Sequence, residues 1–163
     1  MADAGLTVRE VAERIVLTDD PDDLARTVEQ LRYWTREELL HPIGRKHSGT
    51  GRWRRYGERQ VYAAAVWADL ARRGLSIAAL KLARTWLVLD ALDLVKGGRD
   101  PFDVAIQGAV PVHLFRRFGH GDDEPWGGLV IGERALVSAI KGQSFATLLV
   151  VNLSEVFRRV RPA

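Results

Sequence analysis

The feature that most constrains the fold is a pair of helical segments near the N-terminus, separated by an acidic turn. Thr7 and Glu10 have the spacing of a capping box, which predicts that a first helix starts directly after Thr7. The carboxylates around Pro21 interrupt the helical pattern and would lie at the positive end of a second helix. Apolar residues then recur at helical spacing from Leu24 to Leu39. The chain therefore begins as helix, turn, helix.

A glycine-rich, strongly basic segment follows. His41 and Pro42 are expected to end the second helix, because proline cannot continue it. The glycines at 44, 49 and 51 predict a hairpin whose return limb is the aromatic and basic run 52–56. Between His41 and Arg59, six basic residues stand against the single acid Glu58. These basic residues are Arg45, Lys46, Arg52, Arg54, Arg55 and Arg59. We interpret the segment as a wing, with a solvated basic loop as the alternative.

The rest of the chain divides into a helical and a mixed part. An alanine-rich helix is expected from Gln60 to Arg73, and a longer one from the cap Ser76 to about Val95, ended by Gly97 and Gly98. Beyond Asp100 the β-branched, apolar segments 111–118, 129–131 and 147–152 predict strands, with a helix over 133–141.

These segments predict a mainly α fold with a β wing. Residues 1–97 would form a winged helix-turn-helix domain with a long following helix, and residues 98–163 a small α+β region for effector binding or oligomerisation. The chain of 163 residues is long enough for a small domain with such an appendage.

Several classes of site and location are not expected. The chain has no cysteine, which excludes disulfides and thiolate metal sites. The histidines His41, His47, His113 and His120 lack zinc-site spacing, and the acidic residues after His120 fit a polar loop better than a metal or acid–base site. No catalytic or phosphate-binding signature is present, so we expect neither an enzyme nor a cofactor. No segment predicts a signal peptide or membrane span, which favours the cytoplasm.

Three short motifs carry a resemblance to a known family. Leu31-Arg32-Tyr33-Trp34 is followed by Leu39-Leu40-His41-Pro42 and then by Gly51-Arg52-Trp53-Arg54-Arg55-Tyr56. Their order resembles the MerR family of winged helix-turn-helix regulators. The similar segment continues through Val61, Leu70, Gly74, Leu75, Ser76, Ile77 and Leu80. Two departures are a longer link between Ile15 and Leu31, and Glu38 in place of a common glycine.

The resemblance implies a bacterial-type, sequence-specific transcription regulator, associated with the nucleoid, that binds double-stranded DNA. The second helix would enter the major groove and the wing would contact phosphates. On the helix, Arg26, Gln30, Tyr33 and Arg36 would face the DNA, with Arg32 as a further candidate; an ordinary wet helix face is the alternative. On the wing, Arg45, Lys46, Arg52, Arg54 and Arg55 would neutralise phosphates, and Tyr56 would donate to the DNA backbone. Trp34 is expected to fill the core.

The family also implies a homodimer and a small-molecule or protein effector at the C-terminal region. Leu80, Leu87 and Leu94, supported by Ala83 and Leu92, would form a helix–helix seam or pack against the chain itself. The aromatic residues Trp86, Phe102, Phe115 and Trp126 would line a pocket or fill a core.

Two other functions fit the same residues. An architectural, excisionase-like protein that bends DNA would use the same surfaces at broad or arrayed sites. A protein-interaction adaptor would have a winged domain that has lost DNA binding, and its residual binding would be weak and independent of salt.

Overall fold

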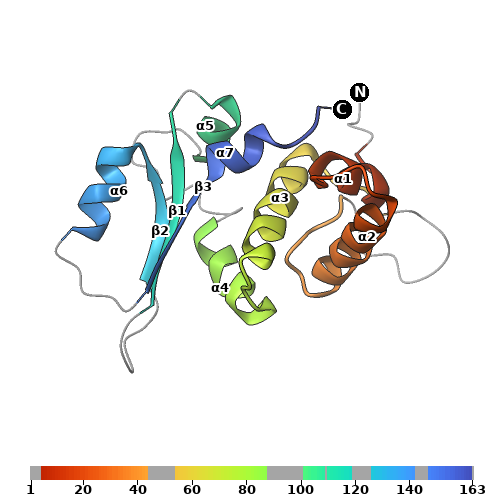
Figure 1. Cartoon of the computed structure of the whole chain (residues 1–163), viewed down its shortest axis with the longest axis horizontal. Helices are drawn as coiled ribbons and strands as arrows, with labels where there is room; N and C mark the ends of the chain where they lie inside the picture. Colours follow the sequence, from red (N-terminus) through yellow and green to blue (C-terminus); the bar gives the residue numbers. More distant parts are fainter. Residues whose placement is uncertain are drawn as a thin grey trace. The chain divides into compact units, whose positions relative to one another are not determined.

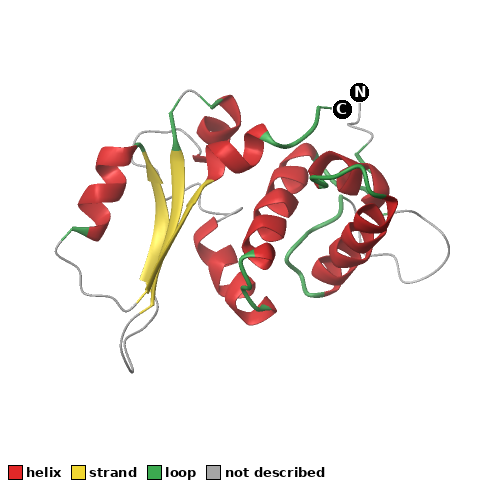
Figure 2. Ribbon diagram, viewed as in Figure 1, coloured by secondary structure: helices red, strands yellow, loops and turns green. Residues whose placement is uncertain are grey.

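The computed structural model describes residues 5–43, 54–87, 101–108, 110–118, 126–141 and 147–162. The chain divides into two compact units. We call Met1–Leu80 together with Arg159–Ala163 the N-terminal unit, and Lys81–Arg158 the C-terminal unit. Figure 2 shows that the described N-terminal part is built from helices and loops, whereas the sheet belongs to the C-terminal unit.

The described residues of the N-terminal unit form three complete helices, and a fourth crosses the boundary of the unit. They are α1 (Val8–Ile15), α2 (Pro21–Arg36), α3 (Glu58–Arg72) and α4 (Ile77–Leu87). In Figure 1, α1, α2 and α3 form one helical group, in which α1 contacts both α2 and α3. The predicted helix-turn-helix order is therefore present, with α2 starting at Pro21 rather than at Leu24.

Local hydrogen bonds explain where the first two helices begin. The Thr7 hydroxyl accepts from the Glu10 N–H at 3.2 Å, and the Glu10 carboxylate accepts from the Thr7 N–H at 2.6 Å. This confirms the capping box, and the backbone bond from Thr7 lowers the pKa of Glu10. At α2, the Asp20 side chain accepts from the Asp22 N–H at 2.9 Å, with Pro21 at the first helical position.

A buried aromatic and aliphatic core joins these helices. Trp34 and Trp67 are fully buried, together with Leu31, Leu39 and Leu70. The Trp67 indole Nε1–H donates to the Leu39 carbonyl at 3.1 Å, so its polar atom is paired inside the core. The prediction that Trp34 packs rather than binds is confirmed.

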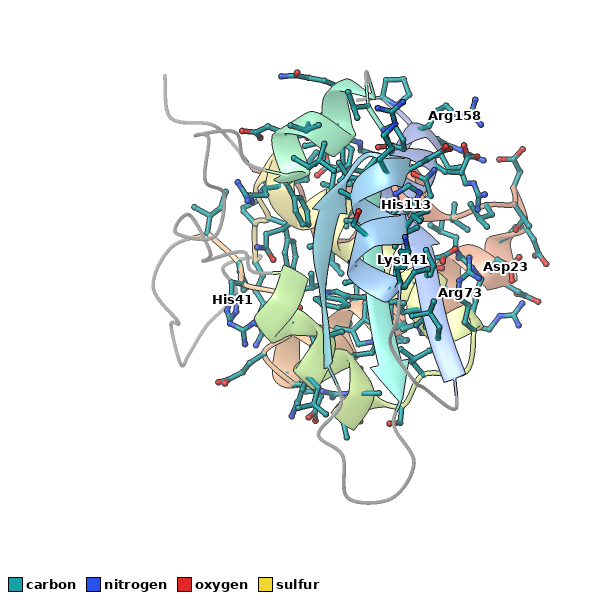
Figure 3. All side chains as sticks on the ribbon, turned by 90° about the vertical axis from the view of Figure 1, so that its left-hand side faces the viewer. Asp23, His41, Arg73, His113, Lys141 and Arg158 are labelled. Atoms are coloured by element: carbon teal, nitrogen blue, oxygen red, sulfur yellow. The ribbon has the colours of Figure 1, made fainter. Side chains whose placement is uncertain are left out.

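The C-terminal unit is a small α+β structure. Its described elements are α5 (Pro101–Gln107), β1 (Val112–Phe118), β2 (Trp126–Ile131), α6 (Glu133–Ile140), β3 (Thr147–Asn152) and α7 (Leu153–Arg158). The strands form an antiparallel sheet in the order β2-β1-β3. In Figures 1 and 3, α6 lies over one face of this sheet; α5 and α7 contact each other and the central strand β1.

The core of this unit settles one of the alternatives for its aromatic residues. Phe102 is buried, and its ring lies 5.2 Å from that of Phe157. It therefore fills the core rather than lining a pocket. The side chains of Trp86, Phe115 and Trp126 lie outside the described residues. His113, labelled in Figure 3, is buried on β1, and its Nδ1 has no hydrogen-bond partner among the described residues.

Part of the predicted organisation falls outside the described residues. Ser76 accepts from the Ala79 N–H at 3.3 Å, as expected for a cap, but α4 is described only as far as Leu87. The predicted end of that helix and the boundary after residue 97 lie beyond it. Leu80 and Ala83 are buried within the single chain, and nothing describes the side chains of Leu87, Leu92 and Leu94.

Candidate nucleic-acid interface

Helix α2 has one buried and one exposed face. Its buried side contains Leu31, Trp34 and Thr35. Its exposed residues repeat at helical spacing and include three arginines: Asp22, Ala25, Arg26, Glu29, Arg32, Tyr33 and Arg36. Gln30 is half-buried at the margin of this face. The structure therefore brings the five helix residues predicted for DNA contact to one side of α2 or its margin.

The arginines on this face differ in their partners. Arg26 donates to the Asp23 carboxylate at 2.5 Å, and Arg32 pairs with Glu29. The Arg36 guanidinium lies 5.7 Å from the centre of the Tyr33 ring, a cation–π distance. Figure 3 labels Asp23, which lies at the start of α2. Because exposed ion pairs are weak, Arg26 and Arg32 can exchange their carboxylate partners for another anion at small cost.

The end of α2 explains one departure from the family pattern. The Leu39 N–H donates to the Trp34 carbonyl at 2.9 Å, and the Glu38 N–H donates to the Thr35 carbonyl at 3.4 Å. This is a Schellman cap, which places Glu38 in a left-handed conformation with φ of 61°. The turn has therefore kept the geometry that favours glycine although a glutamate occupies it.

Replacing Glu38 with glycine is expected to raise the free energy of unfolding by about 1 kcal/mol, because it relieves the left-handed strain of a side-chain-bearing residue. Urea unfolding would measure the change. Gly74 supplies the matched control, since it occupies the same position in the Schellman cap of α3 with φ of 86° and has open space around it. Gly74→Ala should lower the free energy of unfolding by a similar amount. If Glu38→Gly leaves the free energy of unfolding unchanged, the assignment of strain to Glu38 is wrong.

The base of the predicted wing is described on both sides. Ile43 and Arg55 form an antiparallel bridge, in which the Ile43 N–H donates to the Arg55 carbonyl at 2.6 Å. Tyr56 continues the pairing by exchanging two backbone hydrogen bonds with Leu6, each 2.8 Å long. The two limbs that flank residues 44–53 are thus paired as a hairpin requires. The predicted contacts Arg45, Lys46 and Arg52 lie outside the described residues.

Tyr56 has a different role from the one its motif suggested. Its side chain is only 2% exposed, and its hydroxyl lies 2.8 Å from the Thr35 hydroxyl. Because the Thr35 hydroxyl already donates to the Leu31 carbonyl at 2.8 Å, Tyr56 must donate and Thr35 accept. The prediction that Tyr56 donates to a DNA phosphate is wrong for this structure, since the donor is used inside the fold. The hydrogen bond from Tyr56 to Thr35 instead connects the wing base to α2.

Two exposed arginines remain at the wing base. Arg54 is exposed immediately before the paired residues. Arg55 donates to the Gly5 carbonyl at 3.2 Å and lies 3.7 Å from the Glu10 carboxylate. The Arg54 side chain is therefore accessible to solvent, whereas Arg55 holds the N-terminal segment.

Thr35 is the residue of this region that the sequence analysis missed. It follows Leu31 by four residues and therefore lies on the same apolar face. A hydroxyl on a buried helical face needs an internal partner, which is the signal that would have suggested its bonds to Leu31 and Tyr56. Among the described residues, no group of His, Asp and Glu side chains is arranged to hold a metal ion.

Comparison with known proteins identifies the family to which the N-terminal domain is similar. The sequence model of the MerR HTH family regulatory proteins matches residues 6–84, which span α1, α2, the wing base, α3 and most of α4. No match was found among curated proteins. Within the described residues, no helix has the length and apolarity needed to span a membrane. The family match indicates DNA-binding transcription regulation, and the chain thus carries an N-terminal DNA-binding domain of the MerR family.

Proposed function

We propose that the N-terminal unit binds double-stranded DNA in a sequence-specific manner and regulates transcription. The exposed face of α2 would enter the major groove, where Arg suits guanine and Gln suits adenine. Arg54 and the basic residues of the wing would contact the flanking phosphates. The observation that carries this proposal is the hydrogen bond between Tyr56 and Thr35. It fixes the wing base to the helix that displays Arg26, Gln30 and Arg36.

Two further features follow from the family and remain proposals. The chain would act as a homodimer, which is supported by the exposure of Leu82 on α4. The C-terminal unit would receive a small-molecule or protein effector. The absence of cysteine makes a thiolate-bound metal or a disulfide signal unsuitable for that role.

An adaptor without DNA binding is the second candidate, and one observation favours it. Arg26, Arg32 and Arg55 each have a carboxylate of this chain nearby. If those ion pairs persist in solution, the exposed face of α2 and the wing base present balanced charge to a protein partner rather than positive charge to DNA.

Fluorescence anisotropy over a salt series, with promoter-derived and random genomic fragments, separates these functions. Arg54→Ala should weaken binding to all fragments about tenfold at low salt and reduce the salt slope by about one, because one phosphate contact is lost. Arg36→Ala should instead reduce the preference for selected fragments. Arg72→Ala is the matched control, since Arg72 lies about 21 Å along α3 from the wing base.

The outcomes are distinct. Selection of a subset of fragments that is lost in the Arg36 variant supports a regulator. Tight binding to all fragments, with equal salt slopes, would favour an architectural protein. Weak, salt-independent binding by the wild type would sink the proposal and leave the adaptor.

A further inference from the structure

Residues far apart in the sequence meet beside α1. The Arg161 N–H donates to the Arg14 carbonyl at 2.8 Å, and the Arg14 Nε–H donates to the Arg161 carbonyl at 2.7 Å. The same two residues thus exchange two hydrogen bonds. We call residues 159–161 the return segment, because the chain comes back to the N-terminal unit here after the C-terminal unit.

Arg14, which binds the return segment, is itself held in place by a second partner. The Arg14 side chain is 8% exposed, and its two terminal nitrogens donate to the Glu58 carboxylate at 2.5 and 2.6 Å. This bidentate pair raises the pKa of Arg14 and lowers that of Glu58. Glu58 is the first residue of α3 and lies two residues after Tyr56 of the wing base. Arg14 therefore connects α1, the start of α3 and the return segment.

The return segment also reaches the turn before α2. The Arg161 guanidinium donates to the Asp19 carboxylate at 2.8 Å. Asp19 directly precedes Asp20, the N-cap of α2. The turn is rich in carboxylates, and Asp23 accepts from both Thr18 and Arg26. Arg161 supplies a compensating charge that no residue of the turn itself provides for Asp19 among the described contacts.

We propose that the return segment holds the start of α2 in its DNA-binding position, with Arg14 and Arg161 as positioning residues; this role in binding rests on the proposed function. Because α7 ends at Arg158, the return segment begins at the next residue. The return segment is therefore joined covalently to α7 of the C-terminal unit, whereas its contacts with Arg14 and Asp19 lie within the N-terminal unit. Release of the segment loosens the turn and leaves the Asp19 carboxylate uncompensated near the DNA.

Hydrogen exchange and DNA anisotropy on the full chain test this role together. Arg161→Ala removes the ion pair with Asp19, and Arg161→Pro removes both that ion pair and the N–H donor to Arg14. The reporter amides are those of Val16 and Leu24, which donate to Ala12 and Asp20 on either side of the turn. Arg158→Ala is the matched control, because that exposed arginine pairs with Glu155 inside α7.

We expect exchange at the reporter amides to rise at least about fivefold in Arg161→Pro, which loses one hydrogen bond and a weak exposed ion pair, and to rise less in Arg161→Ala, which loses the ion pair alone. DNA affinity should fall about three- to tenfold in the same order, with Arg158→Ala unchanged in both measurements. Retained helical circular dichroism would show that the variants fold.

Three other outcomes would each contradict a different part of the proposal. Unchanged exchange in both Arg161 variants overturns the return segment as a restraint on α2. Raised exchange with unchanged DNA affinity overturns the positioning role. If the wild type binds no DNA at any salt, the proposed function fails, and the exchange data still decide whether the segment restrains α2.

Discussion

Replacing Trp67 with alanine is expected to lower the free energy of unfolding of the N-terminal unit by about 3–5 kcal/mol. Trp67 is fully buried in α3, so truncation leaves a cavity the size of most of an indole. It also leaves the Leu39 carbonyl without its indole donor. Because domains of this size are stable by only about 5–15 kcal/mol, this loss removes a large share of the stability and should lower the melting temperature by more than about 10 °C.

A second substitution separates packing from hydrogen bonding. Trp67→Phe keeps an aromatic ring but removes the Nε1–H donor, so it should lose about half as much as the alanine variant. Urea unfolding followed by circular dichroism at 222 nm would measure both. Equal losses in the two variants would show that the bond to Leu39, rather than the volume of the ring, dominates.

Replacing Arg14 with alanine is expected to lower the free energy of unfolding by about 2–3 kcal/mol. The substitution removes the bidentate pair with Glu58 and the bond to the Arg161 carbonyl. The loss should stay below that of a fully buried pair, because the Glu58 side chain is 52% exposed and regains water. Arg9→Ala is the control, since its exposed pair with Glu13 should change stability by less than about 0.5 kcal/mol.

The same pair should make stability depend on acid pH. Hydrogen bonds from Arg14 lower the pKa of Glu58 below its ordinary value of 4.5. A carboxylate with a lowered folded-state pKa contributes stability that is fully present above 4.5 and lost as pH falls through the lowered pKa. Unfolding measured from about pH 6 to pH 2.5 should therefore show a steeper decline in the wild type than in Arg14→Ala. Parallel curves would contradict the role of Glu58.

Local sequence signals predicted most of the helical architecture. The Thr7–Glu10 box, Pro21 and the glycine at 74 act on their immediate neighbours, so they could be interpreted without the fold. The strand at 147–152 was also predicted with its observed bounds, because β-branched and other apolar residues dominate it.

Two short helices were not predicted. α5 and α7 have seven and six residues, too few for a clear apolar period. The start of α7 carried a signal that could have been used, since the Asn152 side chain accepts from the Glu155 N–H at 3.2 Å as a cap does.

The candidate interface was predictable only where it depended on helical spacing. The exposed face of α2 follows from period alone, which placed Arg26, Tyr33 and Arg36 correctly on the surface. The burial of Tyr56 depends on Thr35 and on the pairing with Leu6, and the Arg14–Arg161 contact joins residues 147 positions apart. Such long-range pairings are set by tertiary packing, and local patterns do not encode them.

The return of the chain to the N-terminal unit also links the folding of the two units. The C-terminal unit, Lys81–Arg158, is inserted between two parts of the N-terminal unit. If that insert were unfolded, docking residues 159–161 would close a flexible loop of about 80 residues at an entropic cost of about 4 kcal/mol. Two hydrogen bonds and an exposed ion pair contribute only about 2–3 kcal/mol. The contacts of Arg161 should therefore form much less often when the insert is unfolded, which makes the order of α2 depend in part on a unit outside the DNA-binding domain.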